Sequence, residues 1–314
     1  MASVTYYLSI ALFIFVALGV LIRFVMLALS VRWIRLEKRL IAGAPIELPK
    51  VSLLIPAFNE EDTIVESVTH AINVSYPDLE VVVVNDGSRD DTLALLVESF
   101  GLSRNDRREM DESIPTQPIR GIWASDEIPN LVVVDKHNGG KADALNCGIN
   151  TSTADYVLAL DADTALTPNT IAYLIRPMIE DETVIATSGS VRILADNNRN
   201  TILSDLQKAE FVNSISLFRT GWNVFNANLI VSGALGLFDK AVLKQVNGYH
   251  NMAIGEDMEL IVRIHRTMLE RGTLYKILQL ALPTCFTRAV PSIGEMVRQR
   301  KRWQKGLLSS LRLN

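Results

Sequence analysis

Four short apolar runs, each ending in a polar motif and followed by a helical pattern, constrain the fold of this chain more than any other feature. The runs are rich in β-branched residues and short, so they predict strands with helices between them. Strands that alternate with helices form a doubly wound, mostly parallel α/β sheet, and ligands of such sheets bind at the carboxyl ends of the strands. The predicted strands cover residues 51–56, 80–84, 131–134 and 156–160.

The rest of the soluble region is less regular. A helix is predicted from residue 168, a strand over 184–193 and helical stretches before residue 222. The segment 102–130 is polar, mixed in charge and carries three prolines, so we predict an inserted surface loop. An apolar content of 48% and a net charge of −4 fit an α/β protein and indicate no bulk affinity for nucleic acid. Cys147 and Cys285 lack metal-binding spacing, which favours buried thiols in a reducing compartment.

The N-terminal stretch 6–31 is apolar apart from Arg23 and a few small polar residues, and it is long enough to cross a bilayer as a helix. A cleaved signal peptide is the weaker alternative, because no positive charge precedes the stretch and it is too long. Basic residues crowd the region just after it, so the positive-inside rule places the N-terminus outside and the remainder in the cytoplasm. We therefore expect a single-pass anchor in the cell membrane, followed by a basic amphipathic segment on the membrane surface.

Two polar motifs indicate a phosphate-bearing nucleotide. Asp86 ends the second predicted strand, and its carboxylate is suited to a nucleoside, although a turn in which Asp and Ser cap backbone amides explains the same residues. Lys141 follows two glycines that let the backbone approach a ligand, and its ammonium can pair with a diphosphate. An exposed lysine near a helix start is the alternative, but that position is unfavourable for the helix dipole.

Asp161 and Asp163 follow the fourth predicted strand, separated by one small residue. Two carboxylates after a buried strand concentrate negative charge, and a hard divalent cation such as Mg²⁺ or Mn²⁺ relieves that cost. Such a cation uses one or two carboxylates plus substrate phosphates, and it neutralises charge on a departing diphosphate. A polar turn without a metal is the competing interpretation.

Asp257 begins an amphipathic helix after Gly255 and Glu256. A carboxylate there can take the proton from an attacking hydroxyl, whereas an acidic pair that stabilises its own helix is the alternative. Ser232 and Gly233 follow an apolar run. Small residues at this point permit close approach of an acceptor, and they equally permit a tightly packed turn.

Gln299, Arg302 and Trp303 belong to a very basic predicted helix near the end of the chain. Residues three and four apart share a helix face, so these side chains can converge. Arg302 can bind a diphosphate, and Trp303 can stack on a sugar ring. A basic helix that contacts anionic lipid is a serious alternative, and both interpretations can hold if different residues serve each.

In this order the motifs NDGS, DAD, GED and QRKRW resemble those of the processive family 2 glycosyltransferases, which include hyaluronan, chitin, cellulose and poly-N-acetylglucosamine synthases. The resemblance covers about residues 49–306, and the QxxRW motif is its most specific element. It implies a GT-A fold, inverting transfer from a UDP-sugar, and Mg²⁺ or Mn²⁺. The stretch VSGALG at 231–236, with GED, is more similar to the hyaluronan, chitin and poly-N-acetylglucosamine branch, which favours UDP-N-acetylglucosamine as the donor.

The resemblance also assigns divisions, partners and roles. The expected divisions are an anchor over 1–31, a basic juxtamembrane segment over 32–48, a catalytic domain over 49–290 and an interfacial helix over 291–314. The expected partners are a UDP-sugar donor, a glycan or lipid-linked acceptor, the lipid bilayer and other subunits of a synthase or secretion complex. The implied roles are a uridine contact for Asp86, diphosphate contacts for Lys141, Asp161 and Arg302, metal binding by Asp161 and Asp163, the general base for Asp257, and acceptor contacts for Ser232, Gly233, Gln299 and Trp303.

One departure from the family pattern leaves alternatives open. Family members continue past QxxRW into further transmembrane helices, whereas this sequence stops at Asn314, so we expect either a fragment or a protein that cannot secrete a polymer unaided. A processive β-glycan synthase is the leading hypothesis. A non-processive transferase that modifies a lipid or membrane-bound acceptor is the nearest alternative. An inactive nucleotide-binding regulatory subunit is the third. The complete set of motif residues argues against it, namely Asp86, Asp163, Asp257 and Arg302.

Overall fold

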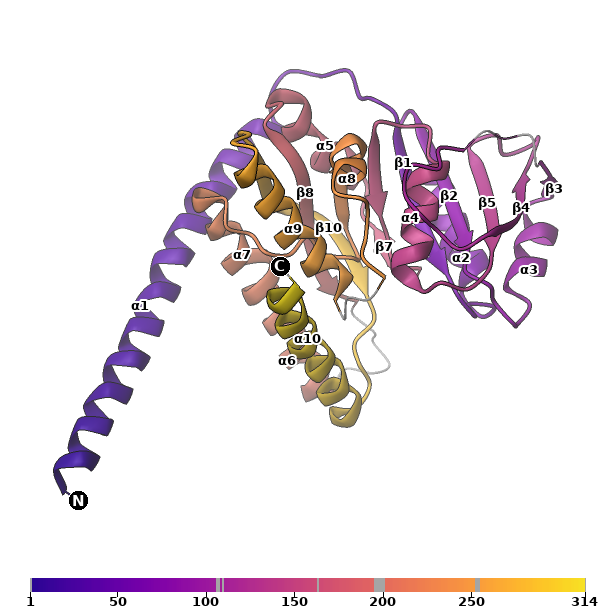
Figure 1. Cartoon of the computed structure of the whole chain (residues 1–314). Helices are drawn as coiled ribbons and strands as arrows, with labels where there is room; N and C mark the ends of the chain where they lie inside the picture. Colours follow the sequence, from indigo (N-terminus) through magenta and orange to yellow (C-terminus); the bar gives the residue numbers. More distant parts are fainter. Residues whose placement is uncertain are drawn as a thin grey trace.

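The chain folds around one twisted ten-stranded sheet with helices on both faces (Figure 1). The computed structural model describes residues 2–105, 108, 110–162, 164–194, 201–251 and 255–313. The strand order is β3-β4-β5-β2-β1-β6-β9-β8-β10-β7. The strands are β1 Val51–Ala57, β2 Leu79–Asn85, β3 Ser103–Arg104, β4 Ile119–Ala124, β5 Leu131–Lys136, β6 Tyr156–Ala159, β7 Ala165–Leu166, β8 Val184–Ile193, β9 Gly236–Asp239 and β10 Lys276–Thr287.

Helices occupy most of the connections between these strands. Their bounds are α1 Ala2–Ile41, α2 Ile64–Ile72, α3 Thr92–Ser99, α4 Lys141–Thr151, α5 Thr170–Glu180, α6 Ile202–Phe211, the π-helix η1 Val212–Phe218, α7 Arg219–Gly221, the 3₁₀ helix η2 Trp222–Phe225, α8 Lys240–Gln245, α9 Glu256–Glu270 and α10 Ile293–Leu313.

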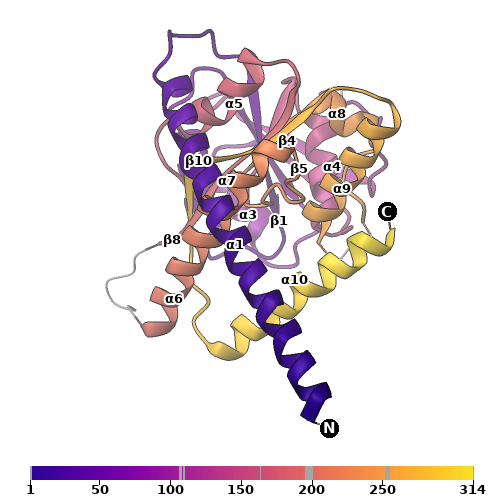
Figure 2. The same ribbon diagram turned by 90° about the vertical axis from the view of Figure 1, so that its left-hand side faces the viewer.

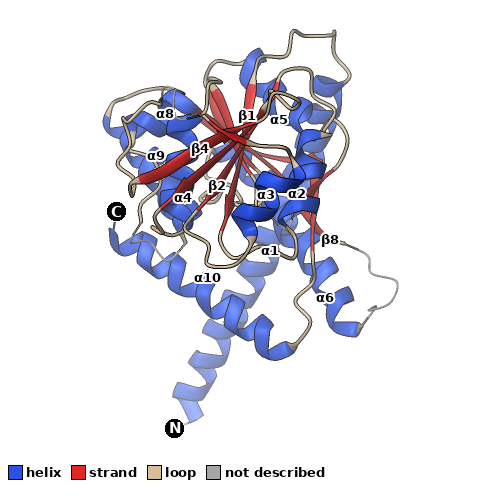
Figure 3. Cartoon of the chain, turned by 90° about the vertical axis from the view of Figure 1, so that its right-hand side faces the viewer, coloured by secondary structure: helices blue, strands red, loops and turns tan. Residues whose placement is uncertain are grey.

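Alternation along the central strands divides the core into two layers. Leu53 and Ile55 of β1 pack with α2, α3 and α5, whereas Leu54 between them packs with α4, α8 and α9. Successive side chains of a strand point to opposite faces of its sheet, so an unbroken apolar run produces two cores. Figure 3 shows the strands as the central red layer with helices on either side.

The strand predictions from the sequence are confirmed for β1, β2, β5, β6 and β8. Strands β5, β2, β1 and β6 pair in parallel, as do β8 and β10. Strand β9 runs antiparallel between β6 and β8, and antiparallel strands also lie at both edges of the sheet. The architecture is therefore α/β with a doubly wound parallel centre, in agreement with the expected fold class.

The prediction of a surface loop over 102–130 is wrong in part. Strands β3 and β4 lie within this segment and form the outer antiparallel edge against β5. Ile122 is buried, but Ile119 at the start of β4 is 37% exposed. The short outer strand β3 pairs only with Trp123 and Ala124, at the other end of β4. A strand with such mixed exposure needs few apolar residues, so its sequence lacks the apolar run that is typical of a central strand.

Helix α1 runs without a break from residue 2 through Val31 to Ile41, so no change of structure marks the expected end of the anchor (Figure 2). Over Thr5–Ile41 it is apolar and long enough to cross a membrane. Its C-terminal half packs on η1 and β10: Ser30 donates to the carbonyl of Leu217, and the buried Glu37 accepts from the Ala281 amide at 3.0 Å. The N-terminal half extends away from the rest of the molecule.

Candidate active site

The predicted site residues come from elements whose ends meet at one edge of the sheet. Asp86 directly follows β2, Lys141 begins α4 after β5, and Asp161 follows β6. Since β2, β5 and β6 all belong to the parallel centre, their carboxyl ends lie on the same side. Helix α9, which carries Asp257, begins beside them.

Asp86 lies in a buried ionic cluster that fixes the loop before α4. The Lys136 Nζ lies 2.5 Å from the Asp86 Oδ1 and 2.5 Å from the Asp143 Oδ2, and all three side chains are at most 3% exposed. The amides of Gly139 and Gly140 donate to the Asp86 carboxylate at 3.0 and 2.7 Å. Asp86 therefore fixes the path of the loop that leads to Lys141, the predicted diphosphate contact. The expected contact of Asp86 with uridine stays a prediction.

Lys141 connects two of the predicted acidic positions. Its Nζ lies 2.5 Å from the Asp161 Oδ1 and 3.6 Å from the Glu256 Oε1. Burial lowers the pKa of Lys141, but Asp161, Glu256 and Asp257 together raise that pKa above its ordinary value, so the ammonium is charged. The Lys141 and Asp161 side chains are 37% and 34% exposed, which leaves this charged pair accessible to a ligand.

Gly233 explains how these groups approach one another. A Cβ added to Gly233 would lie 3.2 Å from the Lys141 Nζ and 4.0 Å from the Asp257 Oδ2. The missing side chain leaves the space between the ammonium and the carboxylate open. Its neighbour Ser232 is partly buried, and its amide donates to the Ser188 hydroxyl at 3.2 Å. The structure thus brings Gly233, Lys141, Asp161 and Asp257 together.

Asp257, the residue that the sequence predicts as the base, has a raised pKa. Burial and the neighbouring Glu256 raise the pKa of the Asp257 carboxyl, against the lowering effects of the Met258 amide, Lys141 and Arg219. A carboxylate with a raised pKa binds a proton more strongly and is a better base near neutral pH. Burial lowers the pKa of Arg219, and the negative charge of Asp257 opposes that effect, so the two side chains interact electrostatically.

The donor set described around Asp161 fits a divalent cation only together with further ligands. Asp163, the second predicted metal ligand, lies outside the described residues. The described residues contain no group of three His, Cys, Asp or Glu side chains arranged for a metal. The Asp161 carboxylate is 34% exposed and pairs with the ammonium of Lys141. One carboxylate with substrate phosphates and waters is a usual Mg²⁺ arrangement.

Helix α10 carries the three residues of the C-terminal motif and abuts the start of α9. Gly255 has a φ of 100°, and a Cβ added to it would lie 3.1 Å from the Gly306 Cα, so glycine permits this close contact. Trp303 is 43% exposed, with its ring 6.5 Å from the Phe211 ring. Gln299 is partly buried and Arg302 is exposed.

In the described part of the chain, no hydrogen bond or ion pair joins Arg302 or Gln299 to the cluster around Asp161. The cation that contacts Trp303 is instead Arg300, whose guanidinium carbon lies 4.1 Å from the ring centroid. Helix α10 thus lies beside the site through Gly255 and Gly306, and its ligand contacts stay predictions.

The sequence interpretation missed three charged contributors to the site. Lys136 and Asp143 flank the glycines of the loop, and an alternation of charged and apolar residues around a strand end could have drawn attention to them. Arg219 lies in a helical stretch far along the chain from Asp257, and nothing local to it indicates a role. Only the three-dimensional arrangement places it near Asp257.

Comparison with known proteins identifies the family. Residues 119–306 match the family described as "Glycosyltransferase like family 2", and residues 52–108 match "Glycosyl transferase family 2". Poly-beta-1,6-N-acetyl-D-glucosamine synthase of Staphylococcus aureus is 28% identical over 261 residues, which are 83% of this chain and 55% of the synthase. The Staphylococcus epidermidis synthase is 27% identical, with 82% and 54% covered. The chain thus spans about half the length of the curated relatives it matches.

Solved structures share the fold. The mannosyltransferase PcManGT from Pyrobaculum calidifontis, in complex with GDP-Man and Mn²⁺, has a TM-score of 0.58 at 20% identity, with 92% of this chain and 74% of the other covered. TarS 1–349 from S. aureus, in complex with UDP, has a TM-score of 0.51 at 18% identity, with 77% and 61% covered. With the fold and the family matches together, this chain belongs to glycosyltransferase family 2 and has the GT-A fold.

Proposed function

We propose that this chain is the catalytic part of a membrane-anchored, inverting glycosyltransferase that moves N-acetylglucosamine from UDP-N-acetylglucosamine to a growing β-linked polysaccharide. The observation that carries the proposal is the cluster of Lys141, Asp161, Glu256 and Asp257 at the carboxyl edge of the sheet. It combines a cation for a diphosphate with a buried carboxylate for an acceptor hydroxyl. The names of the staphylococcal relatives support the sugar and the polymer.

Asp257 is the proposed general base. As the acceptor oxygen attacks the anomeric carbon, the hydroxyl proton passes to the Asp257 carboxylate and the bond between the sugar and the diphosphate breaks. Attack from the side opposite the leaving diphosphate inverts the anomeric centre. The burial that raises the pKa of Asp257 supports this role, because the carboxylate then has a higher affinity for the transferred proton.

Lys141 and Asp161 are the proposed diphosphate side of the site. The Lys141 ammonium pairs with diphosphate oxygens, while Asp161, with Asp163, holds Mg²⁺ or Mn²⁺ and contacts the nucleotide. A bound divalent cation neutralises the charge that develops on the departing diphosphate. The Mn²⁺ named in the structure of PcManGT supports a divalent cation in this fold, and the UDP named with TarS supports a uridine donor.

Asp86 is the proposed uridine contact, and α10 is the proposed acceptor platform. Trp303 presents a partly exposed ring on which a sugar can stack, with Gln299 and Arg302 on the same helix to bind acceptor and diphosphate. Ser232 and Gly233 border the space in which the acceptor hydroxyl must lie. Helix α1 anchors the enzyme with its N-terminus outside and its catalytic domain in the cytoplasm, and other synthase subunits are proposed partners.

Measurement of UDP release across common UDP-sugars, with and without Mn²⁺ or Mg²⁺, tests the donor and the cation. UDP-N-acetylglucosamine with a divalent cation is expected to give the fastest release, and chelation is expected to abolish it. Equal release from every UDP-sugar, or full activity in chelator, would contradict the proposal.

Separation of radiolabelled products by size tests the polymer. A processive enzyme is expected to yield long chains even when most acceptors remain unused. A single added sugar on a lipid would support transfer to a membrane-bound acceptor instead. UDP binding without release under any sugar or metal condition would point to an inactive regulatory subunit.

A further inference from the structure

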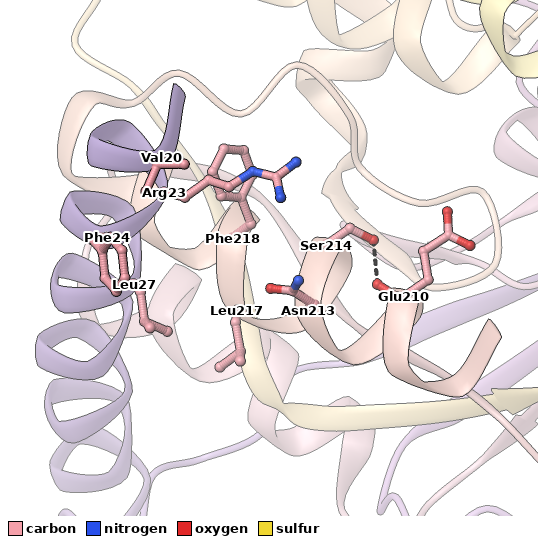
Figure 4. A pocket seen from close by; sticks show the side chains of 9 residues that line it. All are labelled: Val20, Arg23, Phe24, Leu27, Glu210, Asn213, Ser214, Leu217 and Phe218. Carbon is pink, nitrogen blue, oxygen red and sulfur yellow. Dashed lines mark hydrogen bonds between the residues drawn. The ribbon is translucent and has the colours of Figure 1, made fainter. Parts of the chain in front are cut away.

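A pocket of about 600 Å³ lies between α1 and the π-helix η1, and none of its lining residues is a predicted catalytic or ligand-binding residue (Figure 4). One part of its wall is apolar, with Val20, Phe24 and Leu27 from α1 and Leu217 and Phe218 from η1. A volume of this size suits a small ligand or part of a lipid. A seven-residue π-helix is uncommon, and such distortions often occur at functional sites.

The other part of the wall is polar and carries one unpaired charge. Arg23, Asn213 and Ser214 line it, together with Glu210. The Glu210 carboxylate lies 2.5 Å from the Arg300 guanidinium, so its charge is already balanced. Among the described residues Arg23 has no hydrogen bond or ion pair, and Figure 4 shows its side chain reaching from α1 toward η1. The pocket therefore offers a guanidinium without an anion.

The packing of α1 against the rest of the chain determines the depth at which Arg23 lies in a membrane. Met26 is buried against the rest of the chain, and a Cβ added to Gly221 would lie 2.6 Å from the Met26 carbonyl oxygen. Only the part of α1 before residue 26 is therefore free to enter a bilayer. Residues 6–22 form about 25 Å of helix, close to the thickness of a hydrocarbon core. Arg23 then lies at the boundary where lipid phosphates are found.

We propose that this pocket binds the phosphodiester headgroup of an anionic membrane phospholipid. Arg23 pairs with the phosphate, because a guanidinium presents a planar fork that matches phosphate oxygens. The side-chain amide of Asn213 donates to a headgroup oxygen, and the first part of an acyl chain lies against Val20 and Phe24. The Ser214 hydroxyl borders the same wall and donates to the Glu210 carbonyl at 2.6 Å. A basic residue at the level of the headgroups is attracted to anionic lipids, so an anionic lipid is the occupant that this charge favours. The inference rests on the proposed membrane anchoring and goes beyond the proposed transfer reaction.

Lipid retention in nanodiscs tests this site. The full chain is placed in phosphatidylcholine nanodiscs with a graded fraction of phosphatidylglycerol, and the phosphatidylglycerol that stays bound is counted by native mass spectrometry after detergent release. Arg23→Ala is expected to weaken retention about tenfold, the effect of losing one charge-assisted contact. Arg35→Ala is the matched control, since Arg35 is an exposed arginine on the same helix and does not line the pocket.

Two further variants separate the site from general attraction to the membrane. Ser214→Trp fills the pocket and keeps Arg23, so it is expected to reduce retention as Arg23→Ala does. Arg23→Lys keeps the charge and is expected to retain part of the binding. Glycerol 3-phosphate in solution is expected not to compete, because it lacks the acyl chain. Equal retention by wild type and Arg23→Ala, or an equal loss in Arg35→Ala, would overturn the proposal.

Failure of this site can be told apart from failure of the proposed function. UDP release by Arg23→Ala is expected to match the wild type in detergent, because Arg23 belongs to no part of the catalytic cluster. Insertion into nanodiscs without preference for phosphatidylglycerol would overturn the lipid site alone. A wild-type chain that did not enter nanodiscs would overturn both the site and the anchoring, and UDP release would still report on the transfer reaction.

Discussion

Two acidic clusters lie at the same edge of the sheet and differ in what their charges contact. In the buried cluster, Asp86 and Asp143 share Lys136, and every member is at most 3% exposed. In the open cluster, Asp161 and Glu256 share Lys141, and the side chains are between 23% and 37% exposed. Both clusters are built from a lysine and two acidic residues that follow strands or lie at the start of helices, so residue type alone does not separate them.

The difference in exposure indicates different roles: the buried cluster holds a loop in place, and the open cluster has charges available to a ligand. The Asp86 carboxylate receives Lys136 and two loop amides, so its charge is used within the protein. Asp161 and Glu256 both pair with the accessible ammonium of Lys141, which can also pair with a diphosphate, while the carboxylates can bind a divalent cation. Burial with many donors holds a loop in place, whereas accessibility with few donors leaves charge for a ligand. Three substitutions test this contrast.

Lys136→Met is expected to have the largest effect, on stability. It leaves Asp86 and Asp143 buried without their shared cation, which costs about 3–5 kcal/mol of unfolding free energy. Lys276→Met is the matched control, because Lys276 pairs with Asp181 at 2.6 Å while both side chains are at least 38% exposed. The control should cost less than about 1 kcal/mol. Denaturant unfolding of the purified chain measures both, and equal losses would remove the distinction between the clusters.

Lys141→Met is expected to act on ligand binding rather than on stability. Loss of a charged contact to the diphosphate should weaken UDP binding by roughly 10- to 100-fold. Because the Lys141 side chain is 37% exposed, the unfolding free energy should change much less than in Lys136→Met. Calorimetric titration with UDP measures the affinity, with Lys276→Met again as the control. Unchanged UDP affinity would show that the open cluster does not receive the diphosphate.

Glu256→Gln is expected to have the smallest effect, a shift of the pH profile. Asp257 must be deprotonated to act as a base, so activity falls as the pH drops through its raised pKa. The negative charge of Glu256 helps to raise the pKa of Asp257, and its removal lowers that pKa. The acid limb of kcat should therefore move to lower pH, with the plateau rate little changed. A limb that stays in place or moves to higher pH would rule out this coupling.

The sequence predicted the parallel strands β5, β2, β1 and β6 and strand β8 well, and it predicted the outer strands and the antiparallel strand β9 poorly. Strands β1, β2 and β5 are buried on both faces, so their apolar runs are unambiguous. Strand β4, next to the outermost strand, was predicted as a loop, because its first two residues are exposed and only its middle two are buried. Strand β10 was not predicted, since its pairing with β8 is interrupted between Gln279 and Thr284 and depends on contacts distant in sequence.

The candidate site followed the same pattern. The motif residues Lys141, Asp161 and Asp257 could be named from their places at strand and helix ends, and the structure brings them together. The burial that distinguishes Asp86 from Asp161 could not be read from the sequence, because both follow apolar strands. Arg219 was missed because its proximity to Asp257 arises only from the packing of α7.

The most direct test of the account compares sugar transfer and UDP binding in Asp257→Asn. The substitution keeps the size of the side chain and removes its ability to take a proton, so transfer should fall by about 10²–10⁴-fold. The UDP affinity should match the wild type, because the open cluster around Lys141 and Asp161 is unchanged. Asp126→Asn, at an exposed position, should leave both quantities intact. Near-normal transfer by Asp257→Asn would contradict the assignment of the base.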